Sequence, residues 1–334
     1  MKFSNLLIII FLFQFQATYT QVDTIKYGLK GKVIRALASS PANPSVFYAG
    51  LKGSALGSAL IYTSVDAGKT WSALNAGQPI SPYAADIQAI AEAQDETSTI
   101  FAGTWKDGLH KSIDGGRTWA RVESAPSSDI RSLKTGIQTP GLVYAATSSF
   151  GVMKSIDGGA TWQRNHPTVI DSTFKFAWSI EIDERDDKII FAQTYSKGIW
   201  KSTDQGATWQ QALDVKDKVC WDLKLSGNSV WVASSKSRDS ISLIHYSEDL
   251  GETWTEIEDV PQIGVSQINV IKQEGQQVLF VGSWSDGIHM LKEDSWSKVE
   301  QIDYDVISEI LPNKSMRNEI IIGSWGNGIY NLKL

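Results

Sequence analysis

The sequence predicts an all-β protein, a seven-bladed β-propeller of four-stranded blades whose ring is closed by the N-terminal strand. Three observations lead to this prediction. A nonapeptide recurs five times at nearly constant spacing, seven units of similar length consist of short apolar runs and turns, and the last unit stops one strand early. The apolar residues show no helical period in any of these units.

The repeated nonapeptide sets the length of the unit. Three close copies read KSIDGGRTW, KSIDGGATW and KSTDQGATW, and two looser copies read TSVDAGKTW and YSEDLGETW. Their serines follow one another at steps of 43 to 48 residues, at Ser64, Ser112, Ser155, Ser202 and Ser247. A period in this range is typical of stacked repeats and of propeller blades.

Each unit reads as four short strands joined by turns. An apolar run such as IQAI (87–90) precedes a β-rich run that ends in a small residue, such as IFAG (100–103). A glycine-containing turn and the nonapeptide follow, and the last run begins after the Trp of the nonapeptide. Two further units, at 279–291 and 320–332, keep this pattern without the nonapeptide, which gives seven blades.

The two ends of the chain complete one blade. The seventh unit stops after its third strand, and residues 24–37 (TIKYGLKGKVIRAL) read as the end of one unit followed by the start of the next. We therefore expect residues 24–28 to pair with residues 328–332. A ring closed in this way leaves no open edge between the first and last blades.

The pattern S-x-D-x-G-x-T-W resembles the Asp-box, or BNR repeat, and the resemblance covers the whole chain after its N-terminal segment. Proteins with this repeat include sialidases, xyloglucan-degrading glycosidases, sortilin-type receptor domains and photosystem II assembly-factor-like propellers, and the unit spacing is most similar to the last group and to the xyloglucanases. The resemblance implies that the motif lies between the third and fourth strands, on the rim away from the usual active face. The Asp would accept hydrogen bonds from its own turn, the Gly permits a positive φ, and the Trp would pack between sheets. We therefore interpret five carboxylates as structural: Asp66, Asp114, Asp157, Asp204 and Asp249.

The N-terminal segment predicts secretion. Residues 1–20 read as a signal peptide with an apolar core, LLIIIFLF (6–13), that is too short to span a bilayer, and residues 21–334 form a single propeller domain. We expect a secreted or periplasmic protein with no membrane span, and a monomer. The net charge of −6 argues against a nucleic-acid partner. Cys220 is the only cysteine, so a buried core and not disulfides must provide stability.

The units differ from one another at the start of the first strand, where propellers commonly bind ligands. Aligning the seven units there gives two cations, two Trp and three neutral polar residues: Arg35, Gln88, Arg131, Trp178, Trp221, Asn269 and Ser308. Trp faces stack on sugar rings and Arg binds carboxylate or sulfate, so this ring predicts an acidic glycan as partner. The alternative is that these side chains only fill the gaps between blades.

A second ring is expected at the turn between the second and third strands. Four of its seven positions are aromatic, at Trp105, Tyr195, Trp284 and Trp325, and the other three are Lys52, Ser148 and Ser235. We interpret the aromatic residues as substrate-binding. The alternative is that they anchor the hairpin.

The sequence favours a secreted carbohydrate-active enzyme, a hydrolase or an eliminative lyase, that acts on an acidic polysaccharide or oligosaccharide at the channel mouth. The connections between blades contain His166, Asp171 and Asp86, which are the candidate acid–base residues for hydrolysis with two carboxylates or for elimination from a uronic acid. Other carboxylates near the same face are Asp129, Asp222 and Glu309. His110, His245 and His289 occupy one repeat position filled elsewhere by large side chains, which indicates packing. The sequence predicts no metal site and no cofactor. The alternative function is a non-catalytic propeller that binds glycan or protein, or assists assembly.

Overall fold

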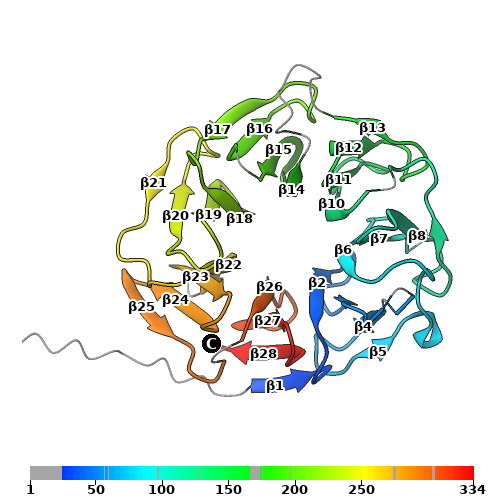
Figure 1. The fold of residues 1–334 in the computed structure, drawn as a ribbon, viewed down its shortest axis with the longest axis horizontal. Helices are drawn as coiled ribbons and strands as arrows, with labels where there is room; N and C mark the ends of the chain where they lie inside the picture. Colours follow the sequence, from blue (N-terminus) through cyan, green and yellow to red (C-terminus); the bar gives the residue numbers. More distant parts are fainter. Residues whose placement is uncertain are drawn as a thin grey trace, which may run out of the picture.

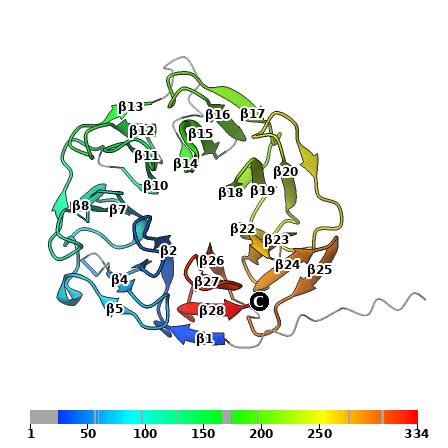
Figure 2. The same cartoon turned by 180° about the vertical axis from the view of Figure 1, so that it is seen from behind.

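The protein is a ring of seven four-stranded antiparallel sheets around a central channel (Figures 1 and 2). The structure, a computed structural model, describes residues 25–334 except 56, 59, 96–97, 127, 166–173, 175, 196, 274–275 and 303–304. The seven-bladed all-β prediction is confirmed. The expected signal peptide lies outside the described residues.

Blades 1 to 4 each contain four consecutive strands, numbered from the channel outward. Blade 1 contains β2 (Ile34–Ser39), β3 (Phe47–Leu51), β4 (Ile61–Ser64) and β5 (Ser72–Ala73), which is followed by the short 3-10 helix η1 (Asn75–Gly77). Blade 2 contains β6 (Ile87–Glu92), β7 (Ile100–Thr104), β8 (Leu109–Ser112) and β9 (Ala120–Arg121). Blade 3 contains β10 (Ile130–Thr135), β11 (Val143–Thr147), β12 (Gly151–Ser155) and β13 (Gln163–Arg164). Blade 4 contains β14 (Ala177–Asp183), β15 (Asp186–Thr194), β16 (Ile199–Ser202) and β17 (Gln210–Leu213).

Blades 5 and 6 follow the same order, and blade 7 takes its outermost strand from the N-terminus. Blade 5 contains β18 (Val219–Ser226), β19 (Ser229–Ser235), β20 (Leu243–Ser247) and β21 (Thr255–Glu256). Blade 6 contains β22 (Val265–Gln273), β23 (Gln276–Ser283), β24 (Ile288–Lys292) and β25 (Ser295–Lys298). Blade 7 contains β26 (Ile307–Pro312), β27 (Glu319–Ser324), β28 (Ile329–Lys333) and β1 (Ile25–Gly28).

The ring closes as predicted. Strand β1 pairs antiparallel with β28, with Ile25 opposite Leu332 and Gly28 opposite Ile329. Figure 1 shows the N-terminal strand as the outer edge of the blade that ends the chain. The first and last blades are thereby joined by backbone hydrogen bonds, and β28 is not left as an open edge.

The core consists of seven apolar clusters, one at each junction between neighbouring blades. Four junctions are tight because the second strand carries a glycine against an isoleucine of the next blade. At Gly103, for instance, a Cβ would lie 2.5 Å from Ile130 Cγ2. At the junction of blades 4 and 5 this pair is replaced by Gln193, which donates 2.7 Å to the carbonyl oxygen of Cys220. Cys220 is buried and unpaired, and burial raises the pKa of its thiol to about 12.

The nonapeptides form closed turns between the third and fourth strands, as predicted. In blade 2, the hydroxyl of Ser112 accepts the backbone N–H of Gly116 at 2.8 Å and donates to Asp114 at 2.8 Å. The Asp114 carboxylate also accepts the N–H and the hydroxyl of Thr118, at 2.9 and 2.6 Å. The Trp119 indole N–H closes the turn on the Gly116 carbonyl at 3.1 Å. The Ser, Asp and Thr contacts recur in the turns at 63–71, 154–162, 201–209 and 246–254.

The antiparallel order fixes two different faces. The innermost strands β2, β6, β10, β14, β18, β22 and β26 all begin at one face, which we call the mouth face. Because neighbouring strands alternate in direction, the turns between second and third strands and the connections between blades also lie at the mouth face. The nonapeptide turns lie at the opposite face.

Candidate functional site at the channel mouth

Every innermost strand carries a β-bulge near its start, at its second residue in six blades and at its third residue in β18. The extra residue is Arg35, Gln88, Arg131, Trp178, Trp221, Ser266 or Ser308. Bulges re-aim side chains and often flank functional sites. Six of these seven residues are those that the sequence alignment placed at the mouth.

The alignment of blade 6 was wrong. The bulge residue there is Ser266, and Asn269 lies three residues further along β22. Asn269 is buried, and its side-chain amide donates 2.6 Å to the Ile310 carbonyl of blade 7. Both VSQI and INVI have an apolar residue at each end, so the apolar pattern alone does not distinguish the two registers.

The bulge residues border a cavity of about 400 Å³ in the channel. Of the residues predicted to bind substrate, seven line it: Arg35, Gln88, Arg131, Trp178, Trp221, Trp284 and Trp325. Below them the wall is small on blades 1 and 2, with Ala36 and Ala89, and charged on blades 5 and 7, with Lys224 and Glu309.

A chain of polar contacts joins the bulge residues of blades 1 to 3. Arg35 and Gln88 both reach one oxygen of the Asp86 carboxylate at 3.4 Å. Arg131 donates to Gln88 at 3.3 Å and is paired with Asp129 at 3.1 Å. Each guanidinium is therefore positioned by a carboxylate that directly precedes an innermost strand. For Arg35 this is Asp86, before β6 of the next blade, and for Arg131 it is Asp129, before β10 of its own blade.

On blades 5 to 7 and on blade 1, guanidinium groups stack on Trp rings. The Arg35 guanidinium carbon lies 4.2 Å from the centre of the Trp325 ring, and that of Arg238 lies 4.5 Å from Trp284. Trp284 packs edge-to-face against Trp325 at 5.8 Å and against Trp221 at 5.5 Å. This arrangement is a continuous cation–aromatic surface.

Arg238 was missed by the sequence analysis. It lies in the turn after β19, which is longer than the equivalent turns of every blade except blade 1 and packs its backbone over Gly264 of blade 6. The length of this turn and the basic residue near its centre are the sequence features that could have identified Arg238.

Blade 4 presents an aromatic platform. Tyr195 stacks on Trp178 with ring centres 5.1 Å apart and planes 15° from parallel. Tyr195 and its neighbour Phe176 are 42% and 54% exposed. On blade 2, Tyr83 and Trp105 are also exposed, and the Lys106 ammonium lies 4.4 Å from the Trp105 ring.

The aromatic side chains are not needed to anchor their hairpins. The residue at this turn position donates its backbone N–H to the carbonyl just before the innermost strand, for example from Trp105 to Asp86 at 3.1 Å. Lys52 and Ser148 make the same bond at 3.0 and 3.1 Å. This backbone bond therefore forms whether or not the residue at the turn position is aromatic.

Of the three candidate catalytic residues, the structure describes Asp86. His166 and Asp171 lie outside the described residues. Asp86 is 2% exposed and accepts hydrogen bonds from Arg35 and Gln88. Glu309 accepts the Lys224 ammonium at 3.0 Å, and burial raises the pKa of Asp222, which accepts the backbone N–H of Ile268 at 2.8 Å.

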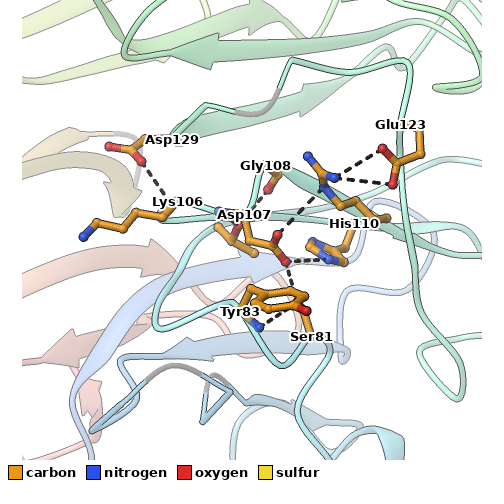
Figure 3. A network of polar contacts seen from close by, with 10 residues as sticks. Ser81, Tyr83, Lys106, Asp107, Gly108, His110, Glu123 and Asp129 are labelled. Atoms are coloured by element: carbon orange, nitrogen blue, oxygen red, sulfur yellow. Dashed lines mark hydrogen bonds and ion pairs between the residues drawn. The ribbon is translucent and has the colours of Figure 1, made fainter.

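Figure 3 shows a further polar network at the mouth end of blade 2. Asp107 lies 3.2 Å from His110, accepts the Ser81 hydroxyl, and lies 3.8 Å from Arg121. Burial lowers the pKa of His110. Blade 6 repeats the network with Asp286, His289 and Lys298, so it is a feature of blade construction.

No group of three His, Cys, Asp or Glu side chains in the described part of the chain could hold a metal ion. No described helix is long and apolar enough to cross a membrane.

No protein-family model matches this chain, and no curated protein matches it. Solved structures do. An ancestral GH74 enzyme superposes with a TM-score of 0.70 at 16% identity, over 90% of this chain and 45% of its own. The GH74 xyloglucanase from Xanthomonas campestris gives 0.69 at 14% identity, over 92% and 53%. YCF48 bound to D1 peptide gives 0.66 at 11% identity, over 93% and 96%.

The likeness is one of fold. The chain spans about half the length of the GH74 enzymes and nearly the full length of YCF48. The neighbours therefore include glycoside hydrolases and a peptide-bound propeller, and both an enzymatic and a binding function are compatible with them.

Proposed function

We propose that the protein binds an acidic glycan at the channel mouth, outside the cytoplasm, and does not cleave it. The observation that carries this proposal is the cluster of Arg35, Arg131 and Arg238 around an aromatic-lined cavity. Burial lowers the pKa of Arg35, Asp86 partly offsets this, and the charges of Arg131 and Arg238 lower it further. Neighbouring cations that repel one another favour the binding of an anion between them.

Sugar rings fit the rest of the mouth. Exposed flat faces at Tyr195, Phe176 and Trp105 provide apolar contact area with polar groups at the ring edges. The net charge of −6 argues against a nucleic acid as the ligand. A carboxylate- or sulfate-bearing glycan needs only the local cluster.

Two observations favour binding without turnover. A catalytic acid or base must reach the substrate, but Asp86 and Asp129 are held by arginines and Glu309 by Lys224. The second is the fold match to YCF48 over nearly its full length, because YCF48 in that structure is bound to D1 peptide. We also propose that the five nonapeptide turns are Asp-box repeats and that they stabilise the blades.

The second candidate is a glycoside hydrolase or polysaccharide lyase. The GH74 neighbours support it, since they share the fold although they are about twice as long. In that case His166 and Asp171, on the connection after blade 3, would act on the bound glycan.

The test uses residues 21–334 and a panel of uronate-rich and sulfated polysaccharides. Affinity electrophoresis measures binding, and new reducing ends or ultraviolet-absorbing unsaturated products measure turnover. We expect retardation of the protein without product. Arg238→Gln should weaken binding about tenfold, which is about 1.4 kcal/mol, whereas Arg117→Gln, the same change on the opposite face, should have no effect.

The result decides between the candidates. Product release that His166→Ala abolishes while binding persists would establish the enzyme. Absence of binding to every anionic polysaccharide would refute the proposed function.

A further inference from the structure

We infer that the glycan lies along a diameter of the mouth, with an anionic residue at the junction of blades 7 and 1 and a sugar ring stacked on blade 4. This inference rests on the proposed function and adds the direction of the ligand and its class. The ligand is an extended acidic oligosaccharide, and a single acidic sugar fills only one end of the site.

The junction of blades 7 and 1 is the anion end. Arg35 of blade 1 already covers the face of Trp325 of blade 7, at 4.2 Å. Arg238, from the turn of blade 5, covers Trp284 of blade 6 at 4.5 Å, and Trp284 packs on Trp325 at 5.8 Å, so the anion end extends from this junction to blade 6. A sugar ring cannot stack on those covered faces. Among the described residues, Arg35 has one carboxylate partner, Asp86 at 3.4 Å, and Arg238 forms no ion pair.

Arg131 differs from these two. Its guanidinium donates 2.9 Å to Ser148, 3.1 Å to Asp129 and 3.3 Å to Gln88. Its charge is paired and its donors are mostly occupied. The uncompensated positive charge of the mouth is therefore concentrated near Arg35 and Arg238.

Blade 4 is the stacking end. The parallel rings of Trp178 and Tyr195 form a rigid two-ring platform, beside which Phe176 is held by the hydrogen bond from the Tyr195 N–H to its carbonyl, at 3.1 Å. The Arg131 guanidinium carbon lies 5.4 Å from the centre of the Trp178 ring. Tyr195 is 42% exposed and, unlike Trp178, Trp325 and Trp284, has no described guanidinium or ammonium over its ring. Its open face suits an uncharged sugar face.

The two ends lie opposite each other. In a ring of seven, blade 4 faces the junction of blades 7 and 1, and Figure 1 shows β14–β17 across the channel from β26–β28 and β2. A ligand that contacts both ends must cross the cavity. The dependence of its affinity on chain length should therefore involve Tyr195, and the dependence on salt should involve Arg238.

The experiment separates these dependences. Oligosaccharide fractions of increasing length are prepared from the polysaccharide that binds most tightly in the panel, and their affinities are measured by calorimetry for wild type, Arg238→Gln and Tyr195→Ala. Both substitutions are at exposed positions, and melting temperatures verify the fold. Arg117→Gln and Tyr83→Ala are the matched controls.

Arg238→Gln should weaken every fraction about tenfold, including the shortest, and should reduce the dependence on salt. Tyr195→Ala should leave the shortest fractions unchanged, weaken the longer ones about tenfold, and preserve the dependence on salt. The inference is overturned if Tyr195→Ala weakens the shortest fractions as much as the longest, or if length has no effect on wild type. In either case the wild-type protein still binds, so the proposed function would stand.

Discussion

Each nonapeptide serine satisfies a backbone donor that the fold has buried. Ser112 is 1% exposed, and its hydroxyl oxygen accepts the N–H of Gly116, which lies in the left-handed region at φ +87°. Because no solvent reaches this N–H, removing the hydroxyl would leave it without a partner. The residue pattern of the repeat is thus explained by hydrogen bonding within the turn.

Ser112→Ala should lower the free energy of unfolding by about 1–3 kcal/mol, the usual cost of an unsatisfied buried donor. Denaturant unfolding measures the change. Ser54→Ala, which removes an exposed hydroxyl, should be nearly neutral. Glycan binding should be unchanged, since the turn lies on the face opposite the mouth, and loss of binding in a stably folded variant would contradict the structural role.

Acid should destabilise the protein through the same turns. The hydroxyl of Thr118 lowers the pKa of Asp114 to about 2, with help from the Thr118 N–H and Ser112, and Thr70 does the same for Asp66. A carboxyl whose pKa is lower in the folded state stabilises the fold above its unfolded pKa of about 4. That contribution is lost as the pH falls from about 4 to about 2.

The denaturation midpoint, measured between about pH 5 and pH 2, should therefore fall with pH. The double variant Asp66→Asn, Asp114→Asn should show a smaller fall, because two of the five carboxyls no longer titrate. Asp294→Asn, an exposed carboxyl outside the turns, is the control. An equal slope in the double variant and wild type would show that these carboxyls do not carry the effect.

At this scale the sequence predicted most of the mouth but not all of it. Arg35, Gln88, Arg131, Trp178 and Trp221 were found because a recurring apolar pair brackets each bulge. Asn269 was misplaced because two registers of β22 fit that pattern, and a bulge leaves no mark in apolar periodicity. Arg238 was missed because it lies in an extended turn that the repeat does not define.

At the scale of strands, the junctions between blades depend on size complementarity. Gly50, Gly103, Gly282 and Gly323 each face an isoleucine of the next blade at distances that exclude a Cβ. The sequence showed small residues at the end of the second strand but gave no partner for them. Their role becomes clear only when neighbouring blades are seen in contact.

Removing β1 should weaken the ring. A variant that begins at Leu29 would lose the four paired residues of β1 and expose the edge of β28. We expect the free energy of unfolding to fall by about 2–4 kcal/mol, from several ladder hydrogen bonds at about 1 kcal/mol each. Calorimetry should show a clear drop in melting temperature.

The matched variant begins at Gln21 and keeps β1. It should melt like the chain of residues 1–334. If the Leu29 variant were equally stable, the closure of the ring would not depend on β1. This element was predictable from sequence because the seventh unit and the N-terminal segment each read as an incomplete part of the same repeat.

Over the whole molecule, charge is distributed unevenly. The chain carries a net charge of −6, yet its mouth gathers Arg35, Arg131 and Arg238. An anionic polymer is therefore repelled by the molecule at long range and attracted only at the mouth. Salt screens both effects, with a Debye length of about 10 Å at 0.1 M.

Because the arginines contact the proposed ligand directly, the loss of their attraction at high salt should outweigh the loss of the long-range repulsion. We expect affinity for the acidic glycan to fall several-fold between about 0.05 and 0.5 M salt. Equilibrium titration at several salt concentrations measures this. Affinity that is constant or rises with salt would indicate that the arginines do not meet the anion.

The pairing of β1 with β28 has a consequence for the order of assembly. Blades 1 to 6 each fold from one continuous stretch, but blade 7 needs both ends of the chain at once. Contacts between residues far apart in sequence form slowly, so the joint should be the last to form. Until this joint forms, β28 would be an unpaired edge, and such an edge can pair with strands from other molecules. A circular permutant that joins the present termini and opens the chain between blades 3 and 4 would make blade 7 continuous. It should refold faster and aggregate less, because the rate-limiting joint would have become a local one.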